Sequence, residues 1–539
     1  MQTRRDQVQA HRFVVGRLTT GLMRTDPDAP EGPHSRTNRA MAFGGALGAV
    51  LAVGFLVFGL ISPGGSDAWR DPRTLIVEAG TGNRYLYDGT LRPVRNYASA
   101  RLIVGERLAS RTVPSASLAG TARGGAVGID GAPDALPPAG RVDGGPWQVC
   151  AGTAATASGG TVPTTTLTVD GDRGAAGLGS GQGLLVRGPD DREYLLWHGN
   201  RFRLAAGTAT ADALGYGTAR PLPVSAAFLD AVPASADLAP PAVPGRGSAG
   251  PRLDGRPTKV GQVFVVDTPG AVKQYYLLQR AGLVPVSTTQ AALVLASPEE
   301  RVSAYGGGAP VAVPIAADAL GGALVRGAPA GVSDVLPQAP PVLVPLDGGR
   351  AACVRVDGAV SAPGAGGAGR ARRVRVGLGV LSAPAASGVR GGGPQAPAAP
   401  ACRPVDAVLV PPSGGSLVRA LDAAGSPVGS TTYLVTDAGV KYLLADAKAA
   451  GALGYDVTRA RGLPSPLLSM VPTGPDLSQR DALSGRAVTT TLAGCAGTAG
   501  TSGKVPAGQA AYSSGTPSVR VPVSNAQNPR HGTPLEKHT

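Results

Sequence analysis

The amino-acid sequence predicts a single-pass membrane protein with a short N-terminal cytoplasmic helix, one transmembrane helix and an α+β extracytoplasmic region of small repeats around a β-rich core. Three observations lead to this prediction. Residues 40–62 form an uncharged, mostly apolar run of 23 residues. Arginines are concentrated on the N-terminal side of that run. The long region after it contains a sequence motif that recurs at an offset of 239 residues.

The apolar run at residues 40–62 has the length of a membrane span. At about 1.5 Å of rise per residue, a helix of this length spans roughly 30 Å or slightly more, the thickness of a bilayer core. Its glycines are compatible with this assignment, because glycine is common in membrane helices. A cleaved signal peptide is the alternative, but 39 residues precede the run and no A-x-A-like site follows Ser62 cleanly. We therefore expect a transmembrane helix.

The charges on the two sides of the run predict its orientation. Residues 1–39 carry seven arginines, whereas residues 63–80 carry only Arg70 and Arg73. Lys and Arg are enriched on the cytoplasmic side of membrane spans. We therefore expect a cell-membrane protein with a cytoplasmic N-terminus and an exported C-terminal region, with Trp69 as a candidate anchor at the outer interface.

The N-terminal segment, residues 1–39, is expected to contain a basic amphipathic helix and a linker. An apolar stripe recurs at steps of three and four residues. It consists of Val8, His11, Val15, Leu18 and Leu22. The stripe is too short to fold alone, so it requires a partner or a surface. Anionic lipid headgroups and other proteins of a membrane complex are both possible partners.

The repeat is clearest in the stretches that begin at Tyr194 and Tyr433, which align without a gap over some 45 residues. This alignment pairs Leu204 with Leu443. Each copy predicts two short strands around a turn, an Ala-rich helix that ends at Gly-Tyr, and an extended exit marked by proline. Four ranges are assigned to repeats, the first and third being weaker copies: 74–105, 194–238, 262–295 and 431–477.

The rest of the exported region is expected to form a β core and a tail. Val/Leu-rich segments at 323–331, 351–360 and 372–382 are expected to be strands of a central β core. The extracytoplasmic domain is assigned to residues 63–497. Residues 498–539 have the composition of a disordered tail.

All four cysteines lie on the predicted exported side, and none forms a C-x-x-C pair. They are Cys150, Cys353, Cys402 and Cys495. Disulfides are therefore expected rather than metal ligation. Four cysteines allow three connectivities, and their order along the chain suggests pairs of the first with the second and the third with the fourth.

Several activities find no support in the sequence. The net charge of +14 is mostly due to arginine, and no basic cluster is interleaved with aromatics, so no nucleic-acid binding is expected. The nearest approach to a Walker A loop, GTSGKV at 500–505, lacks the first glycine and the hydroxyl after the lysine. His198 is the one histidine in the expected folded outer region, and it lies in a repeat turn. No catalytic, cofactor-binding or metal-binding residue is assigned.

The N-terminal motif RRDQVQAHRF at Arg4–Phe13, followed by a basic helix, one span and outer repeats, resembles the EccB family. This family is a membrane component of the type VII (ESX-type) secretion systems of actinobacteria. The resemblance covers nearly the whole chain. It implies an elongated extracytoplasmic domain of four repeats around a β-rich core, with a disulfide between Cys150 and Cys353. A second bridge between Cys402 and Cys495 lies beyond what the resemblance implies.

The resemblance also implies a role and partners. The expected role is that of a structural core subunit of a membrane complex that exports small WXG-type proteins. The implied partners are an EccC-type ATPase, EccD-type and EccE-type membrane subunits, a mycosin-type protease, membrane lipid, and other copies of the chain through the outer domain. No cofactor is expected from the residues, and ATP enters only through the resemblance, since ATP hydrolysis is attributed to the family. Two alternatives remain: an ATP-hydrolysing component of the same system, and a cell-wall-associated binding protein.

Overall fold

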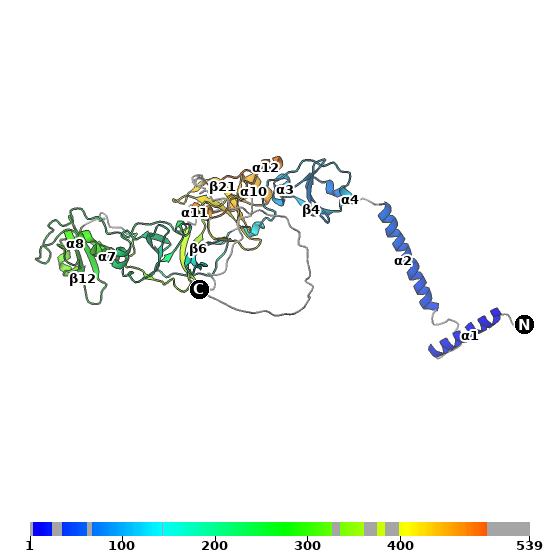
Figure 1. The fold of residues 1–539 in the computed structure, drawn as a ribbon, viewed down its shortest axis with the longest axis horizontal. Helices are drawn as coiled ribbons and strands as arrows, with labels where there is room; N and C mark the ends of the chain where they lie inside the picture. Colours follow the sequence, from blue (N-terminus) through cyan, green and yellow to red (C-terminus); the bar gives the residue numbers. More distant parts are fainter. Residues whose placement is uncertain are drawn as a thin grey trace, which may run out of the picture. The chain divides into compact units, whose positions relative to one another are not determined.

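The structure is a computed structural model and describes residues 4–23, 35–61, 67–142, 144–325, 335–359, 374–382 and 398–492. The expected tail, Cys495 and the segment 500–505 lie outside these residues. Two helices begin the chain, α1 (Arg4–Met23) and α2 (Ser35–Ile61) (Figure 1). Thr37–Val57 of α2 is long and apolar enough to cross a membrane, and no other helix in the described residues passes this test.

Four small sheets with the same strand order follow. In each, three antiparallel strands form a meander and a fourth strand pairs in parallel with the first. Their strands are β1 (Thr74–Glu78), β2 (Arg84–Tyr87), β3 (Leu91–Pro93) and β4 (Ala109–Val113); β8 (Gln182–Arg187), β9 (Glu193–Trp197), β10 (Asn200–Arg203) and β11 (Leu222–Pro223); β12 (Val263–Val266), β13 (Gln274–Gln279), β14 (Gly282–Val286) and β15 (Val313–Pro314); and β20 (Gly415–Leu421), β21 (Pro427–Thr436), β22 (Lys441–Leu444) and β23 (Arg461–Pro464). The strand β16 (Val342–Leu343) also pairs with β8.

Helices connect the third and fourth strands, because a parallel pair needs a crossover. They are α3 (Tyr97–Val104), α5 (Thr208–Ala213), α7 (Thr288–Ala296) with α8 (Pro298–Ser303), and α10 (Ala447–Leu453) with η4 (Val457–Arg459). Side-chain N-caps start four of them: Asn96 at α3, Ser287 at α7, Asp446 at α10 and Asp456 at η4. A left-handed glycine ends α10, Gly454 at φ 89°.

A short helical turn follows each fourth strand, and the chain then returns beside the third strand. These turns are α4 (Ser115–Leu118), α6 (Ala226–Asp230), η3 (Ala317–Leu320) and α11 (Ser465–Ser469). The returning segments make parallel bridges to the third strand: Val94 with Val127, Leu204 with Leu238, Leu283 with Leu324, and Leu444 with Leu477. We call these returning stretches the exit segments.

The structure corrects the ungapped repeat alignment in one place. Asn200 pairs with Trp197 across a two-residue turn, whereas Thr436 N–H donates to Val440 C=O across three residues. The extra residue shifts the third strand, so Leu204 corresponds to Leu444 and not to Leu443. Both bridge the same position of their exit segments. The prediction also left out the first strands of these two units, β8 and β20, which precede the assigned ranges.

A six-stranded sheet forms the central β core, in the order β19-β6-β5-β17-β18-β7. Its strands are β5 (Trp147–Ala155), β6 (Thr161–Thr168), β7 (Ala176–Gly177), β17 (Ala351–Asp357), β18 (Arg375–Leu381) and β19 (Ala407–Leu409). The expected strands at 351–360 and 372–382 are therefore confirmed as β17 and β18. For 323–325, the described part of the remaining segment, the expectation is wrong, because Leu324 belongs to the exit segment of the third sheet. Residues 326–331 lie outside the described part.

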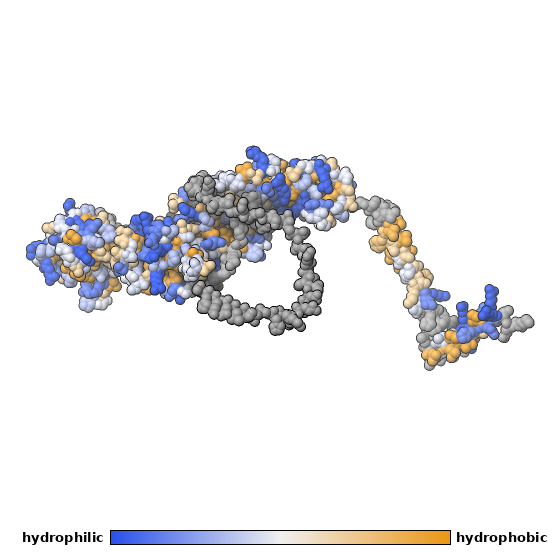
Figure 2. Space-filling view, in the orientation of Figure 1, coloured by the Kyte–Doolittle hydropathy of each residue, from blue (hydrophilic) through white to orange (hydrophobic). Residues whose placement is uncertain are grey.

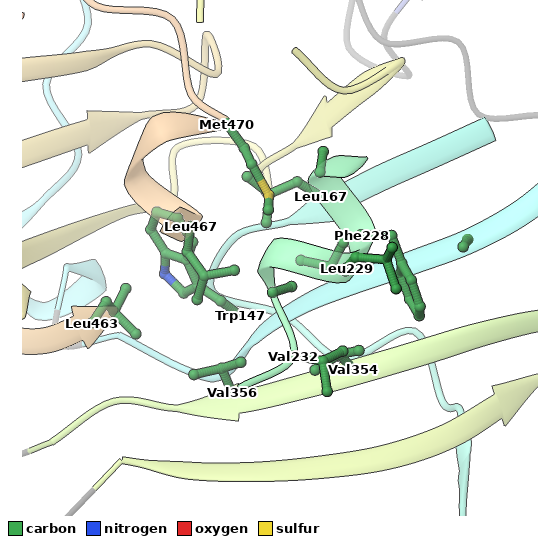
Figure 3. Close-up of a cluster of buried hydrophobic side chains, with 14 of the residues drawn as sticks. Trp147, Leu167, Phe228, Leu229, Val232, Val354, Val356, Leu463, Leu467 and Met470 are labelled. Carbon is green, nitrogen blue, oxygen red and sulfur yellow. The ribbon is translucent and has the colours of Figure 1, made fainter. Parts of the chain in front are cut away.

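One hydrophobic core joins the central sheet to the second and fourth sheets. It contains Trp147 of β5, Val354 of β17, Phe228 of α6 and Leu467 of α11, all at most 1% exposed. Figure 3 shows side chains from α6 and α11 in one cluster with these strands. The two helices at equivalent repeat positions therefore pack in a shared core.

Helix packing links the remaining sheets. Helix α3 of the first unit contacts α10 and α12 (Gln479–Ser484), and α5 of the second unit contacts α7 of the third. Two short helices complete the described elements, η1 (Asp67–Arg70) and η2 (Ala139–Arg141). Trp69 of η1 is 1% exposed and packs edge-on against Tyr87, so it is a core residue rather than the expected interfacial anchor.

Candidate functional site

Helix α1 presents an exposed apolar surface. The predicted stripe residues Val8, His11, Val15, Leu18 and Leu22 are all exposed. Leu18 is 60% and Leu22 84% exposed, which is unusual for large apolar side chains. Phe13, Val14, Arg17 and Gly21 continue this exposed surface along the helix. Figure 2 shows hydrophobic and charged residues side by side on α1 and mainly hydrophobic residues along α2.

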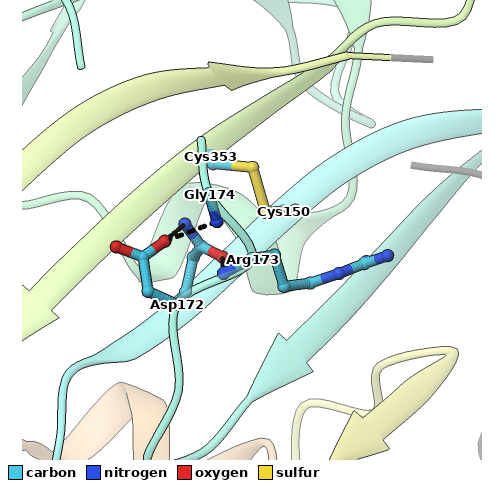
Figure 4. Close-up of a disulfide and its surroundings, with 6 residues drawn as sticks. Cys150, Asp172, Arg173, Gly174 and Cys353 are labelled. Atoms are coloured by element: carbon cyan, nitrogen blue, oxygen red, sulfur yellow. Dashed lines mark hydrogen bonds between the residues drawn. A yellow bond between two sulfur atoms is a disulfide. The ribbon is translucent and has the colours of Figure 1, made fainter. Parts of the chain in front are cut away.

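The central sheet contains a disulfide. Cys150 of β5 and Cys353 of β17 are bonded directly across the antiparallel pair (Figure 4). Both side chains are buried. The loop beside them is fixed by Asp172, whose Oδ1 accepts from the Gly174 N–H at 2.8 Å. Cys402 is also disulfide-bonded, and Cys495, its expected partner, lies outside the described residues. The Cys150–Cys353 bond joins positions that are 203 residues apart in the chain.

A groove of about 410 Å³ lies beside the second sheet. Tyr194 of β9, Arg201 and Arg203 of β10, Asp230 of α6, and Asp237 of the exit segment line it. Arg203 Nε donates to Asp237 Oδ1 at 3.1 Å, and Arg201 Nη1 lies 3.7 Å from Asp230 Oδ1. Arg403 also pairs with Asp230 and Arg192 with Asp190, so each carboxylate of the lining has a cationic partner.

Two ionisable groups of the groove are perturbed by their neighbours. Burial and the nearby Asp190 carboxylate raise the pKa of the Tyr194 hydroxyl, which donates to Asp190 Oδ2 at 3.3 Å. The hydrogen bond and charge of Asp237 raise the pKa of Arg203. Both groups therefore keep their protons at neutral pH, and neither is available as a base.

In the fourth sheet, a buried side chain fills the position that corresponds to this groove. Lys441, the equivalent of Arg201, is 1% exposed and its Nζ donates to the Val471 C=O. Burial lowers its pKa to about 8. The position equivalent to Asp230 is Ser469, so Lys441 has no counterpart of the Arg201–Asp230 ion pair.

Another cavity, of about 720 Å³, lies where the first and fourth units meet. The end of α3, the start of α10 and the start of α12 line it. Two of its three carboxylates, Asp446 and Asp481, accept local hydrogen bonds from the Ala449 N–H and the Ser478 hydroxyl, and Glu106 is the third. No group of three or more His, Cys, Asp or Glu side chains suited to a metal occurs in the part of the chain that the structure describes.

His198 occupies the two-residue turn between β9 and β10. Its φ is 46° and that of Gly199 is 75°, the pattern of a type I′ hairpin turn. Its ring stacks on Trp197 with centroids 3.9 Å apart, and Nε2 lies 2.9 Å from the Ser180 carbonyl oxygen. These contacts are those of a turn residue.

The groove residues Arg201, Arg203 and Asp230 were not identified from the sequence. Because the hairpin turns differ in length, the ungapped repeat alignment misaligned the arginines of β10 with the fourth unit by one residue. Their charge was also unremarkable in an arginine-rich chain.

An exposed amphipathic helix, a helix fit to span a membrane, and an α+β region of small sheets with a disulfide define a membrane-anchored α+β protein. The family model described as "Type VII secretion system ESX-1, transport TM domain B" matches residues 1–490. The chain therefore belongs to this EccB family of type VII secretion components.

Individual relatives agree with the family assignment. The ESX-3 secretion system ATPase EccB3 of Mycolicibacterium smegmatis is 29% identical over 506 residues, 89% of this chain and 90% of the relative. A solved EccB3 dimer from the ESX-3 core complex is similar, with a TM-score of 0.59, 27% identity and coverage of 76% of this chain and 99% of that one. A chain of an intact ESX-5 inner membrane complex, with a TM-score of 0.58 and 23% identity, covers 95% of this chain and 98% of that chain and shares its fold.

Proposed function

We propose that the chain is a structural core subunit of a type VII secretion membrane complex that exports small WXG-type proteins. The observation that supports this proposal is that the family model matches residues 1–490 and that the EccB3 relative aligns with 89% of the chain. The EccB3 relative with a solved structure is a dimer from an ESX-3 core complex. A subunit of such an assembly needs membrane attachment and surfaces for neighbours, and α2 and α1 offer these.

The proposed topology is single-pass, with α1 in the cytoplasm and the four small sheets outside. The seven arginines of residues 1–39 support this orientation. We take the four sheets as four copies of one repeat. Their common strand order and their exit segments support a count of four. In this proposal the outer region also makes the contacts between copies of the chain.

We propose that the exposed α1 surface binds the membrane-embedded and cytoplasmic neighbours. EccC-type, EccD-type and EccE-type subunits are the expected ones, and a mycosin-type protease is the expected outer partner. An exposed stripe of large apolar side chains supports a protein or lipid contact on α1. Lipid headgroups would compete for the same basic helix.

We further propose that the chain needs no nucleotide for this role. Relatives carry ATPase in their names, which favours ATP hydrolysis as a second candidate function. The sequence has no complete phosphate-binding loop of the Walker A type. Isothermal titration of the purified full-length chain with Mg²⁺-ATP decides between the two: measurable binding would contradict the proposal.

The first test is purification of the tagged full-length chain in mild detergent, with native gels and mass spectrometry. We expect one large species that contains an FtsK-like ATPase and a multi-span protein. In Leu18→Glu, a charge on the exposed stripe should remove these partners, whereas Gln9→Glu places the same charge on the opposite face of α1 and should retain them. A lone monomer or dimer that binds isolated peptidoglycan would favour the wall-binding alternative.

A further inference from the structure

The exit segment of the second unit, residues 233–238, has one unpaired edge. On its inner side, the Arg201 N–H donates to the Pro233 C=O at 2.8 Å and the Ser235 N–H donates to the Arg201 C=O at 2.9 Å. Ala234, between them, therefore directs its own N–H and C=O outward. Ala234 is exposed, and no hydrogen bond joins its backbone to another of the described residues.

The same edge of the fourth unit is paired. There the Lys441 N–H donates to the Pro472 C=O at 2.9 Å and the Gly474 N–H to the Lys441 C=O at 2.8 Å. Thr473, the equivalent of Ala234, exchanges both of its outward hydrogen bonds with Ala399, at 2.7 and 2.9 Å in antiparallel register. Thr473 is only 2% exposed. The chain itself thus supplies a short added strand at this edge.

The path of the added strand has an equivalent in the second unit that is open at Ala234, while Asp230 at its other end lies 3.3 Å from Arg403 Nε. After Ala399 the chain continues to Arg403, whose N–H donates to the Ser469 C=O at 3.1 Å. The positions equivalent to Thr473 and Ser469 are Ala234 and Asp230, and both line the 410 Å³ groove described above. The groove of the second unit therefore lies at the position that an extended segment occupies in the fourth unit.

We propose that this groove binds an extended polypeptide segment of another subunit, which adds to the 233–238 edge as a β-strand. Main-chain hydrogen bonds to an exposed strand edge supply binding in this mode, and side-chain pockets supply selectivity. The segment in the fourth unit has the sequence Ala-Ala-Pro-Ala at 398–401. Each charged side chain of the lining has a partner of opposite charge: Asp237 pairs with Arg203, Asp230 with Arg201 and Arg403, and Asp190 with Arg192, so none is left for a charged ligand. The bound segment is accordingly uncharged, with small side chains.

The inference rests on the proposed function only in taking another subunit of the complex as the source of the segment. Amide hydrogen exchange on the full-length chain, alone and in the purified complex, tests the occupancy of the edge. The amide of Thr473 should exchange slowly in both samples. The amide of Ala234 should exchange fast in the isolated chain and at least tenfold more slowly in the complex. An intact complex with unchanged exchange at Ala234 would overturn the inference and leave the proposed function standing, whereas failure to recover a complex would count against the proposed function.

A photo-crosslinker identifies the occupant. Placed at Pro189 on the groove rim, it should join an Ala-, Pro- or Gly-rich segment of a different protein, whereas the same group at the exposed Val272 should not. Ala234→Pro removes the outward N–H and should lower the crosslink yield at least tenfold, while Ala234→Thr keeps that N–H and should retain the yield. Neither variant removes an internal backbone hydrogen bond, so both should fold. Crosslinks only to a second copy of the chain, or only to lipid, would overturn the proposal.

Discussion

Replacing the buried Lys441 with methionine should make the protein more stable at neutral pH. The ammonium of Lys441 is 1% exposed and faces the Val471 carbonyl oxygen, without a carboxylate partner among the described residues. Burial disfavours the charged form and lowers the pKa of Lys441 to about 8, from an ordinary value of 10.5. Methionine has a similar length and carries no charge.

The shift of the pKa sets the size and the pH dependence of the effect. Between pH 8 and pH 10.5 the unfolded chain binds a proton at Lys441 that the folded chain has released, so the free energy of unfolding rises with pH across this window. A shift of this size corresponds to about 3 kcal/mol. The methionine variant also leaves the Val471 carbonyl oxygen without its hydrogen-bond donor, which lowers its stability by about 1 kcal/mol. We expect Lys441→Met to gain about 2 kcal/mol at pH 7 and to lose this advantage near pH 10.5.

Urea denaturation of the full-length chain in detergent, followed by tryptophan fluorescence at the two pH values, measures this difference. The matched control is Lys448→Met, which removes a charge from an exposed position of α10 and should change stability by less than about 0.5 kcal/mol. Suppose instead that Lys441→Met were less stable than the parent at both pH values. The ammonium would then be a net stabilising group, and the argument from burial would be refuted.

Three further predictions concern single side chains. Arg246→Met leaves the fully buried Glu300 carboxylate without its cation and should cost about 3 to 5 kcal/mol of stability at pH 7. Because burial raises the pKa of Glu300, the carboxylate is protonated more readily and the loss of stability should shrink at acidic pH. Denaturation curves at neutral and acidic pH would show this difference. Phe228→Ala opens a cavity in the shared core and should cost about 3 to 5 kcal/mol in the same assay, whereas Val272→Ala, at an 87% exposed site, should be nearly neutral. His198→Asn keeps a residue suited to the type I′ turn but removes the ring contacts to Trp197 and the Ser180 carbonyl, so it should cost about 1 kcal/mol of stability and leave co-purification of the complex unchanged. A loss of complex without a larger loss of stability would indicate a direct role for His198.

The N-terminal helices and the better repeats were predictable because their signals are local. Helix α2 could be predicted from the length of its uncharged apolar run alone. Helix α10 could be predicted from an Ala-rich stretch between the N-cap Asp446 and the left-handed Gly454. The register of β10 against β22 was not predictable, since it depends on whether a hairpin turn takes two residues or three. The groove could not be foreseen either, because only the fold brings Tyr194 and Asp230 together.

Packing explains why the second and fourth repeats are the pair that sequence comparison recovers. Helices α6 and α11 insert equivalent side chains into the same core, with Phe228 and Ala231 from one and Leu467 and Met470 from the other. A large side chain in one copy corresponds to a smaller one in the other at both positions, as close packing in a shared space requires. The corresponding turns of the first and third units do not enter this core. The two similar units thus share their buried surface and differ at the exit edge, which the chain itself covers in the fourth unit and leaves open at Ala234 in the second. That difference lies outside the common core, where packing does not dictate it, so a binding role is the stronger explanation for the open edge.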